Sequence, residues 1–330
     1  MARLHRVLII GAGSIGERHL RCFQATRRAE VAFVEINPQL RREVMDRHRV
    51  VPYADLDAAL TNEHDAAVIA TPAPLHVPLA TRLAALRIHV LIEKPLSVNL
   101  DGVDRLRQAI QDHHLVAAVA YVYRCHPGLA AMREAIHNSR FGRPVQLVAV
   151  SGQHFPTYRP AYRDIYYKDR ATGGGAIQDA LTHVINAGEW LIGPVQRLVA
   201  DAHHQVLEGV DVEDTVHVLT RQAEALSSYS LNQHQAPNET TLTVICENGT
   251  ARCDFHENRW RWMTRPEEPW HDEPAEPLER DTLFIAQANA FLDAVEGRRL
   301  PPCSLDEGLQ TLRVNLAALA SVETGTWQTV

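Results

Sequence analysis

The sequence has 330 residues, of which 45% are hydrophobic and 22% are charged, and its net charge is −7. This size and composition predict a globular protein of about two domains. The acidic balance, without any long basic run, argues against nucleic acid or an anionic membrane as the main partner. No apolar run approaches the roughly 20 residues of a membrane-spanning helix.

The five cysteines are scattered, odd in number and without a C-x-x-C pair. This pattern is typical of reduced thiols rather than of a disulfide framework. The first predicted strand begins at Val7, which leaves no room for a signal peptide before it. We therefore expect a cytoplasmic protein.

The first 120 residues alternate between strand-like and helix-like patterns. The expected strands are Val7–Ile10, Val31–Glu35, Ala66–Ala70, His89–Glu93 and Leu115–Tyr121. The expected helices cover residues 14–26, 38–48, 76–86 and 101–113. Such alternation predicts a doubly wound parallel sheet with helices on both faces. We assign residues 1–122 to this α/β domain.

Residues 123–330 have a different pattern and are assigned to a second α/β domain for substrate binding and oligomerisation, with packing of the last helices on the first domain as the alternative. Helices are expected at 127–138, from Gly173 to about 191, at 282–296 and at 305–322. Strands are expected at 145–151, 196–203, 214–220, 225–232, 240–246 and 250–255, and a surface loop at 264–280. Turn residues connect most of these strands, so a large, mostly antiparallel open sheet is predicted.

The first predicted strand runs directly into the motif Gly11-x-Gly13-x-x-Gly16. Gly11 allows a tight turn, Gly13 lets a pyrophosphate approach the backbone, and Gly16 lets the helix pack close to the strand. The amides at the helix start, around Ser14 and Ile15, would then face the phosphates.

An acid ends the second predicted strand. Glu35 lies 19 residues after Gly16, where a carboxylate bonds the ribose hydroxyls of the adenosine half of NAD. Arg41 and Arg42 fall inside the following helix and are set aside. The cofactor is therefore predicted to be NAD.

Two further segments follow the third and fourth predicted strands. The residues expected to contact the cofactor there are Thr71, Pro72, His76, Glu93 and Lys94. Ligands of open α/β sheets bind at the carboxyl ends of the strands, so Lys94 should point into that crevice. A solvated lysine at the start of a helix is the alternative.

A glycine-rich segment carries Asp179 and His183, four residues apart on a predicted helix. This spacing places both side chains on one face, where an aspartate can orient a histidine for proton transfer. An ordinary Asp–His contact on a helix is the alternative interpretation.

Taken together, these motifs resemble the glucose-fructose oxidoreductase/inositol dehydrogenase/rhizopine catabolism (Gfo/Idh/MocA) family. The resemblance rests on G-A-G-S-I-G-E-R-H, on Glu93-Lys94-Pro95 and on the D-x-x-x-H of residues 179–183, and it extends over the whole chain. It implies a Rossmann domain followed by an α/β domain whose sheet often mediates oligomerisation. It also implies that Lys94, Asp179 and His183 are the catalytic set, and that the Lys94–Pro95 bond is cis.

Substrate contacts are expected from Tyr123, Arg124, His154, Arg159 and Arg163. The tyrosines and arginines of residues 158–167 resemble a W-R-P-x-x-x-Y-R pattern of one sugar-metabolism branch, with Tyr158 in place of the tryptophan. They can either bond a substrate or staple a long loop. No histidine falls in a metal-binding spacing, so no metal is predicted.

These features predict an NAD-dependent oxidoreductase that acts on a secondary alcohol of a sugar, sugar derivative or cyclitol. The enzyme is expected to be a homo-oligomer, a dimer or tetramer formed through the second domain's sheet. The alternatives are NAD-dependent glycoside cleavage through transient oxidation and elimination, and a non-catalytic dinucleotide-binding regulator.

Overall fold

The computed structural model describes residues 3–273 and 275–330. The chain forms two compact units. The first contains the chain up to Val122 together with Glu279–Leu309, and the second contains Tyr123–Leu278 and Gln310–Val330. The division falls within helix α10, Leu305–Thr324.

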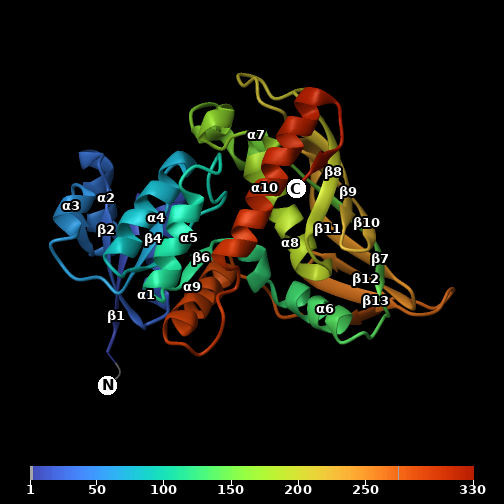
Figure 1. The fold of residues 1–330 in the computed structure, drawn as a ribbon, viewed down its shortest axis with the longest axis horizontal. Coiled ribbons are helices and arrows are strands. Elements are labelled where there is room, and N and C mark those ends of the chain that lie inside the picture. The colour runs from blue at the N-terminus through green and yellow to red at the C-terminus, as the bar shows by residue number, and fades with distance from the viewer. Residues whose placement is uncertain (1–2, 274) are drawn as a thin grey trace. The chain divides into compact units, whose positions relative to one another are not determined.

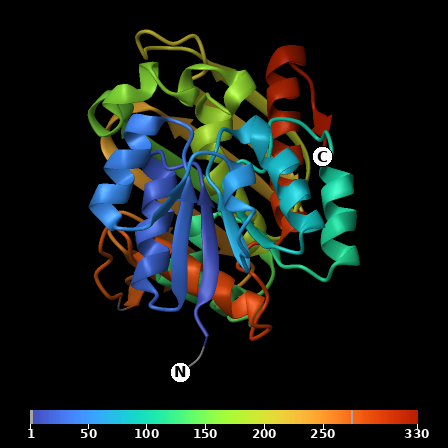
Figure 2. The ribbon, with the colours of Figure 1, turned by 90° about the vertical axis from the view of Figure 1, so that its left-hand side faces the viewer.

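The first unit is built on a parallel sheet of six strands in the order β3-β2-β1-β4-β5-β6, which confirms the predicted doubly wound fold. The strands are β1 (His5–Ile10), β2 (Ala29–Val34), β3 (Val51–Tyr53), β4 (Ala66–Ile69), β5 (His89–Ile92) and β6 (Ala117–Val119). The helices are α1 (Ser14–Ala25), α2 (Pro38–His48), α3 (Leu56–Ala59), α4 (His76–Ala85), α5 (Val103–Asp112) and α9 (Thr282–Val295). Figure 2 shows the strands between flanking helices. The sequence does not predict the short β3.

Burial explains why these segments form strands and helices. Val7, Leu8 and Ile9 of β1 are fully buried, as expected for a parallel strand covered on both faces. Helix α1 presents an apolar face to the sheet, and its Phe23 contacts Phe291 of α9 edge-on, with ring centroids 6.3 Å apart. Helix α9 thereby belongs to the core of the first unit although it is distant in sequence.

The second unit is built on a nine-stranded sheet in the order β14-β13-β12-β11-β7-β10-β9-β8-β15. Its strands are β7 (Pro144–His154), β8 (Val195–His203), β9 (Thr215–Gln222), β10 (Ala225–Asn232), β11 (His234–Cys246), β12 (Gly249–Asp254), β13 (Arg259–Met263), β14 (His271–Glu273) and β15 (Gln328–Thr329). All neighbouring strands are antiparallel except β7 and β10, so the mostly antiparallel sheet is confirmed.

One prediction is wrong in this sheet. The stretch 264–280 was expected to be a loop, but β14 lies within it and pairs with β13. Trp262 explains the pairing, because its indole N–H donates to Glu273 and its ring stacks on His271 at 4.1 Å. Residue 274 lies outside the described residues.

Helices cover one face of the nine-stranded sheet. They are α6 (Pro127–His137), α8 (Thr182–Ile192) and the C-terminal part of α10 (Figure 1). The strands alternate accordingly: in β9, Val216 and Val218 are buried, whereas Leu219 and Arg221 are exposed. Within the described part of this unit, no helix lies on the second face.

In residues 3–273 and 275–330, the helices are too short or too polar to cross a membrane.

An ion-pair cluster of His5, Arg28 and Glu296 lies where β1 and β2 begin in the first unit. It makes the stability of this unit depend on pH. Glu296 accepts from His5 at 2.8 Å and lies 2.9 Å from Arg28, and these bonds lower its pKa to about 2. The unfolded chain protonates Glu296 near 4.5, so the stabilisation is complete above that pH and is lost as the pH falls toward 2. Glu296→Gln should therefore lower the free energy of unfolding by about 1 kcal/mol at pH 7, and by much less near pH 2.

Urea unfolding of both proteins between pH 2.5 and 7 measures this difference. Glu30→Gln is the matched control, because Glu30 is an exposed carboxylate on β2. A Glu296→Gln effect that is equal at all pH values would contradict the assignment.

Candidate active site

The glycine turn between β1 and α1 is shaped by two close backbone approaches. Gly11 adopts a φ of +89°, and a Cβ at this position would lie 2.8 Å from the Ala70 carbonyl oxygen. A Cβ on Gly16 would lie 1.8 Å from the Gly11 carbonyl oxygen. A Cβ on Gly13 would meet nothing within 4 Å. The turn thus leaves open space at Gly13, beside the start of α1 at Ser14 and Ile15, where a pyrophosphate group fits.

Glu35 follows β2 and is joined to this turn. Its Oε2 accepts from the Ala12 N–H at 2.9 Å, and its Oε1 accepts from the Asn37 N–H at 2.8 Å. A carboxylate offers about four lone-pair positions, so it retains acceptors for ribose hydroxyls. Arg41, which was not predicted to contact the cofactor, donates from Nη1 to the Glu35 carbonyl oxygen at 2.7 Å.

The turns after β4 and β5 are connected by a buried histidine. The two ring nitrogens of His76 lie 2.9 Å from the Pro95 carbonyl oxygen and 2.8 Å from the Thr71 carbonyl oxygen. Burial lowers the pKa of His76, while the carbonyl contacts oppose this effect. His76, predicted with Thr71 and Pro72 to contact the cofactor, therefore joins the backbone of Thr71 to that of Pro95.

The Glu93-Lys94-Pro95 turn carries the predicted catalytic lysine. The Lys94–Pro95 peptide bond is cis, as expected. Glu93 is buried, its Oε1 lies 2.6 Å from His19 Nε2, and its Oε2 accepts from the Lys94 N–H at 3.0 Å. Glu93 is thereby held against the protein, and Lys94 lies at the carboxyl end of β5.

In the second unit, Asp179 lies in a π-helical turn, Ile177–Leu181, directly before α8. The sequence predicts one continuous α-helix here, so the local geometry differs from the expectation. A π turn closes with i→i+5 hydrogen bonds, and residues four apart remain about one turn apart. π turns inside helices are frequent at functional sites.

Asp179 has a hydrogen-bond partner that the sequence does not predict. The Tyr166 hydroxyl donates to Asp179 Oδ1 at 2.6 Å, and Asp179 is 5% exposed. Charge-assisted hydrogen bonds of this length fix a carboxylate firmly. The aromatic stretch at 158–167 was the only available signal for Tyr166, and it does not indicate which tyrosine reaches Asp179.

His183, at the start of α8, packs beside Tyr123, with ring centroids 5.2 Å apart. Tyr123 in turn packs on Phe255 at 4.6 Å. Burial raises the pKa of Tyr123, while a hydrogen bond to Thr240 and the positive charge of Arg159 act to lower it. Tyr123, a predicted substrate contact, therefore lies beside His183, and the charge of Arg159, another predicted substrate contact, acts on Tyr123.

The other predicted substrate residues make contacts within the second unit. Arg124 is buried and donates from Nε to Asn186 Oδ1 of α8 at 2.8 Å. Arg163 donates to the Tyr162 hydroxyl at 3.1 Å and to the Glu208 carbonyl oxygen at 2.9 Å. These contacts favour the interpretation of Arg163 as a loop staple, and they show Arg124 supporting α8.

His154 lies at the end of β7, where it neighbours another histidine. Its Nδ1 lies 2.6 Å from the Thr157 hydroxyl, and its ring centroid is 4.6 Å from that of His234 on β11. Among residues 3–273 and 275–330, no group of three His, Cys, Asp or Glu side chains is arranged to hold a metal ion.

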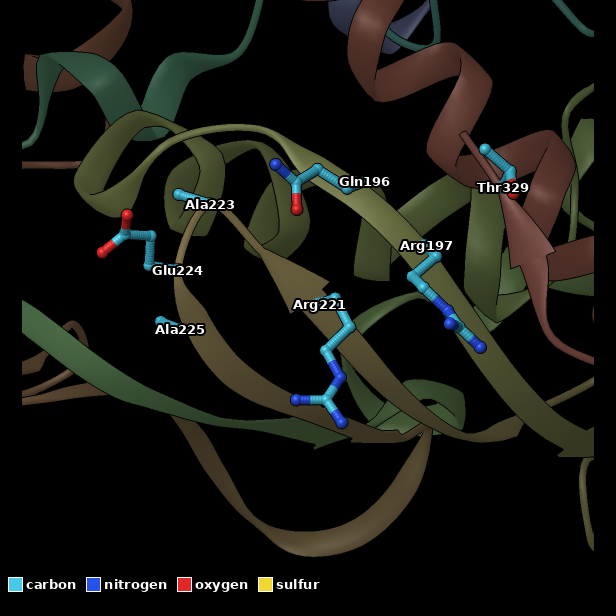
Figure 3. A pocket seen from close by; sticks show the side chains of 7 residues that line it. All are labelled: Gln196, Arg197, Arg221, Ala223, Glu224, Ala225 and Thr329. Atoms are coloured by element: carbon cyan, nitrogen blue, oxygen red, sulfur yellow. The ribbon is translucent and has the colours of Figure 1, made fainter.

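A surface hollow occurs in the second unit where the start of β8, the end of β9 and the turn into β10 meet β15. It is lined by Gln196, Arg197, Arg221, Ala223, Glu224, Ala225 and Thr329 (Figure 3). Arg197 and Arg221 face each other from paired strands. None of the predicted catalytic or cofactor residues lines this hollow.

Two family models match the chain. The model of the oxidoreductase family with an NAD-binding Rossmann fold matches residues 5–121. The model of the GFO/IDH/MocA C-terminal domain matches residues 129–252. Together they cover well over half of the sequence.

Curated relatives match nearly the full length. UDP-N-acetylglucosamine 3-dehydrogenase of Acidithiobacillus ferrooxidans is 25% identical, over 96% of this chain and 97% of the relative. Inositol 2-dehydrogenase of Acidothermus cellulolyticus is 29% identical, over 95% and 91% respectively.

A solved structure shares the fold. Levoglucosan dehydrogenase in complex with NADH and levoglucosan superposes with a TM-score of 0.89 at 22% identity, over 100% of both chains. The two family models and the fold together lead to one conclusion: this chain belongs to the Gfo/Idh/MocA family and is an NAD-dependent oxidoreductase.

Proposed function

We propose that this protein transfers a hydride between NAD and a secondary alcohol or ketone carbon of a sugar, sugar derivative or cyclitol. The observation that carries the proposal is Lys94, held at the carboxyl end of β5 in the sheet that binds NAD. The relatives named for UDP-N-acetylglucosamine, inositol and levoglucosan support a polyhydroxylated substrate.

The proposed chemistry divides between the two units. Gly11–Gly16 and Glu35 would hold NAD, which would supply the acceptor for the hydride of the carbinol carbon. His183 takes the hydroxyl proton, and Asp179, fixed by Tyr166, orients the imidazole and stabilises its charged form. Lys94 donates to the substrate oxygen as it becomes a carbonyl, and it can share the proton transfer. Tyr123, beside His183, and Arg159, whose charge acts on Tyr123, would bond further hydroxyls of the substrate.

A cofactor-reduction screen over sugars, sugar acids, sugar nucleotides and inositols tests this function. NADH formation with one of these compounds is expected. Release of the aglycone from an aryl glycoside without net NADH formation would instead establish glycoside cleavage by oxidation and elimination. NAD binding without turnover of any compound would support a dinucleotide-binding regulator.

The proposal extends to location and assembly. All five cysteines are thiols outside any disulfide, and four are buried, which suits a reducing cytoplasm. The uncovered face of the nine-stranded sheet exposes Leu219 and Leu226 on the paired strands β9 and β10. A second copy of the chain would cover these side chains, so we propose a homo-oligomer formed through this face.

Cofactor choice tests the role of Glu35. Its carboxylate, fixed by the Ala12 and Asn37 amides, should accept from the free ribose hydroxyls and repel a 2′-phosphate. Kd values for NADH and NADPH, measured by fluorescence, should therefore favour NADH. Glu35→Gln should reduce that preference by roughly tenfold, equivalent to about 1.4 kcal/mol, because it removes the charge that repels the 2′-phosphate.

Arg41→Ala is the companion variant for cofactor choice. Arg41 contacts the Glu35 backbone rather than its carboxylate, so this change should leave the preference for NADH intact. A native preference for NADPH would contradict the role assigned to Glu35.

The catalytic assignment predicts large losses of turnover. Lys94→Met keeps the length of the side chain but removes its charge, and His183→Ala removes the proposed base. Each should lower kcat by roughly 10²–10⁴-fold, as expected for a positioned proton-transfer group. The double variant should lose far less than the product of the two factors if both groups act in one step.

NADH affinity separates catalysis from cofactor binding in these variants. His183→Ala should change the Kd for NADH little, because Gly11–Gly16 and Glu35 belong to the first unit. Near-native turnover in either single variant would remove that residue from the mechanism.

The oligomer prediction concerns the uncovered sheet face. Leu219→Glu combined with Leu226→Glu should lower the molar mass measured by light scattering after size-exclusion chromatography, because buried unpaired charges disrupt an interface. Leu300→Glu is the control, since Leu300 is 85% exposed in the first unit. A native protein that is monomeric would overturn the proposed assembly.

A further inference from the structure

Glu213 is a buried carboxylate that takes no part in the chemistry proposed above, and it joins two segments of the second unit. Its side chain is 0% exposed. Its Oε1 accepts from the Ile177 N–H at 3.1 Å, where the π turn begins, and its Oε2 accepts from Arg170 Nε at 2.8 Å. Glu213 therefore bonds the backbone that leads into Asp179 and also the end of the aromatic segment, residues 155–172.

The two glycines before the π turn are packed between Glu213 and the aromatic segment. A Cβ on Gly175 would lie 2.4 Å from Glu213 Oε1, and a Cβ on Gly174 would lie 2.2 Å from the Tyr167 carbonyl oxygen. The Gly175 carbonyl oxygen accepts from the Asp179 N–H at 3.0 Å. The position of Asp179 therefore depends on the close approach of these glycines to both neighbours.

The aromatic segment carries Tyr166, the donor to Asp179. The Tyr166 carbonyl oxygen accepts from the Thr172 hydroxyl at 2.8 Å, and the Arg170 carbonyl oxygen accepts from Gln178 Nε2 at 3.0 Å. These bonds connect Tyr166 to the part of the segment that Glu213 holds through Arg170.

Glu213 is itself held in a fixed turn. Its carbonyl oxygen accepts from the Ala176 N–H at 3.0 Å. The neighbouring Asp214 carboxylate accepts, at 2.8–3.0 Å, from the N–H groups of Gln205, Val206 and Leu207 and from the Thr215 hydroxyl. A network in which the buried carboxylates are satisfied is rigid, so Glu213 is presented from a fixed position.

We propose that Glu213 is a positioning residue, which holds the aromatic segment and the π turn together so that the Tyr166 hydroxyl meets the Asp179 carboxylate. One buried carboxylate that bonds both segments fixes their separation, and loss of either contact leaves an unsatisfied group between them. This inference rests on the proposed function only in the catalytic importance of Asp179 and His183.

A second glutamate–arginine pair joins the aromatic segment to the same loop and provides a matched control. Glu208 lies 3.4 Å from Arg163, and its side chain is 86% exposed. An exposed pair contributes little to stability, whereas the loss of one partner from a buried pair is costly. Glu208→Gln and Glu213→Gln therefore remove the same charge at the surface and in the interior.

Hydrogen exchange followed by mass spectrometry tests the proposal without a substrate. In Glu213→Gln, the amides of residues 164–181 should exchange roughly tenfold faster, because the carboxylate that bonds both segments is lost. The amides of β12, in the same unit, should exchange as in the native protein. Glu208→Gln should be native in all of these peptides.

Arg170→Met, alone and combined with Glu213→Gln, tests whether the charge pair is responsible. Arg170→Met leaves Glu213 as a buried carboxylate without its arginine, so exchange of residues 164–181 should be faster than in Glu213→Gln. The double variant removes both charges and should exchange more slowly than Arg170→Met. If Arg170→Met does not fold, the comparison of Glu213→Gln with Glu208→Gln still tests the proposal.

Three results would overturn the proposal. They are native exchange of residues 164–181 in Glu213→Gln, equal effects of Glu213→Gln and Glu208→Gln, and an acceleration that extends equally to β12. The last result would show a general loss of stability instead of a local displacement of Asp179.

Turnover provides a second readout once a substrate is known. Glu213→Gln should lower kcat by roughly 10- to 100-fold, as misplacement of a reacting group does, with little change in the Kd for NADH. Added to Tyr166→Phe, it should cause little further loss, because both changes act on the same bond to Asp179. Near-native turnover of Asp179→Asn would reject the catalytic role of Asp179, while the exchange result would still report on Glu213.

Discussion

The close packing of Gly16 against the Gly11 carbonyl determines the geometry of the glycine turn between β1 and α1, where the cofactor is proposed to bind. A Cβ at residue 16 would lie 1.8 Å from that oxygen, so α1 can approach β1 this closely only with glycine. This approach sets where α1 begins and leaves the space beside Gly13 open. It also brings His19, one turn later, to the end of β5 and to Glu93. One backbone contact therefore determines both the phosphate-binding turn and the neighbourhood of Lys94.

In the second unit, two buried carboxylates fix the position of α8 and of the turn before it. Glu213 is fully buried, accepts from the Ile177 N–H at 3.1 Å and pairs with Arg170 at 2.8 Å. A Cβ on Gly175 would lie 2.4 Å from Glu213 Oε1, which explains a glycine at this position. The negatively charged Glu213 thus fixes the start of the helical segment that carries Asp179, because it lies against the backbone there.

A second carboxylate fixes the other end of α8. Glu189 accepts from the Thr311 hydroxyl at 2.7 Å, and Thr311 in turn accepts from Asn186, the partner of Arg124. Burial raises the pKa of Glu189, and its hydrogen bonds oppose that shift. Because both ends of α8 are held, His183 is presented on a rigid element rather than on a loop.

The features that could be predicted from the sequence are those that depend on residues close together in the chain. The Gly11–Gly16 turn, the position of Glu35 after β2 and the strand–helix alternation follow from spacing and periodicity over a few residues. The contacts of His19 and Tyr166 were missed because each joins residues that only the folded chain brings together, 74 and 13 positions apart. The role of Arg163 remained open for a different reason, since an arginine that binds a substrate and one that staples a loop have the same local pattern.

Lys94 and Asp179, the two charged residues proposed for catalysis, are both held in place through a buried carboxylate. Lys94 follows a carboxylate that His19 and a backbone amide hold, and Asp179 is itself a carboxylate held by Tyr166. Each unit therefore fixes its chemical group by satisfying a buried carboxylate with a donor from another segment. Because an unsatisfied carboxylate is costly in such surroundings, these contacts resist reorientation of the Lys94 backbone and of the Asp179 carboxylate.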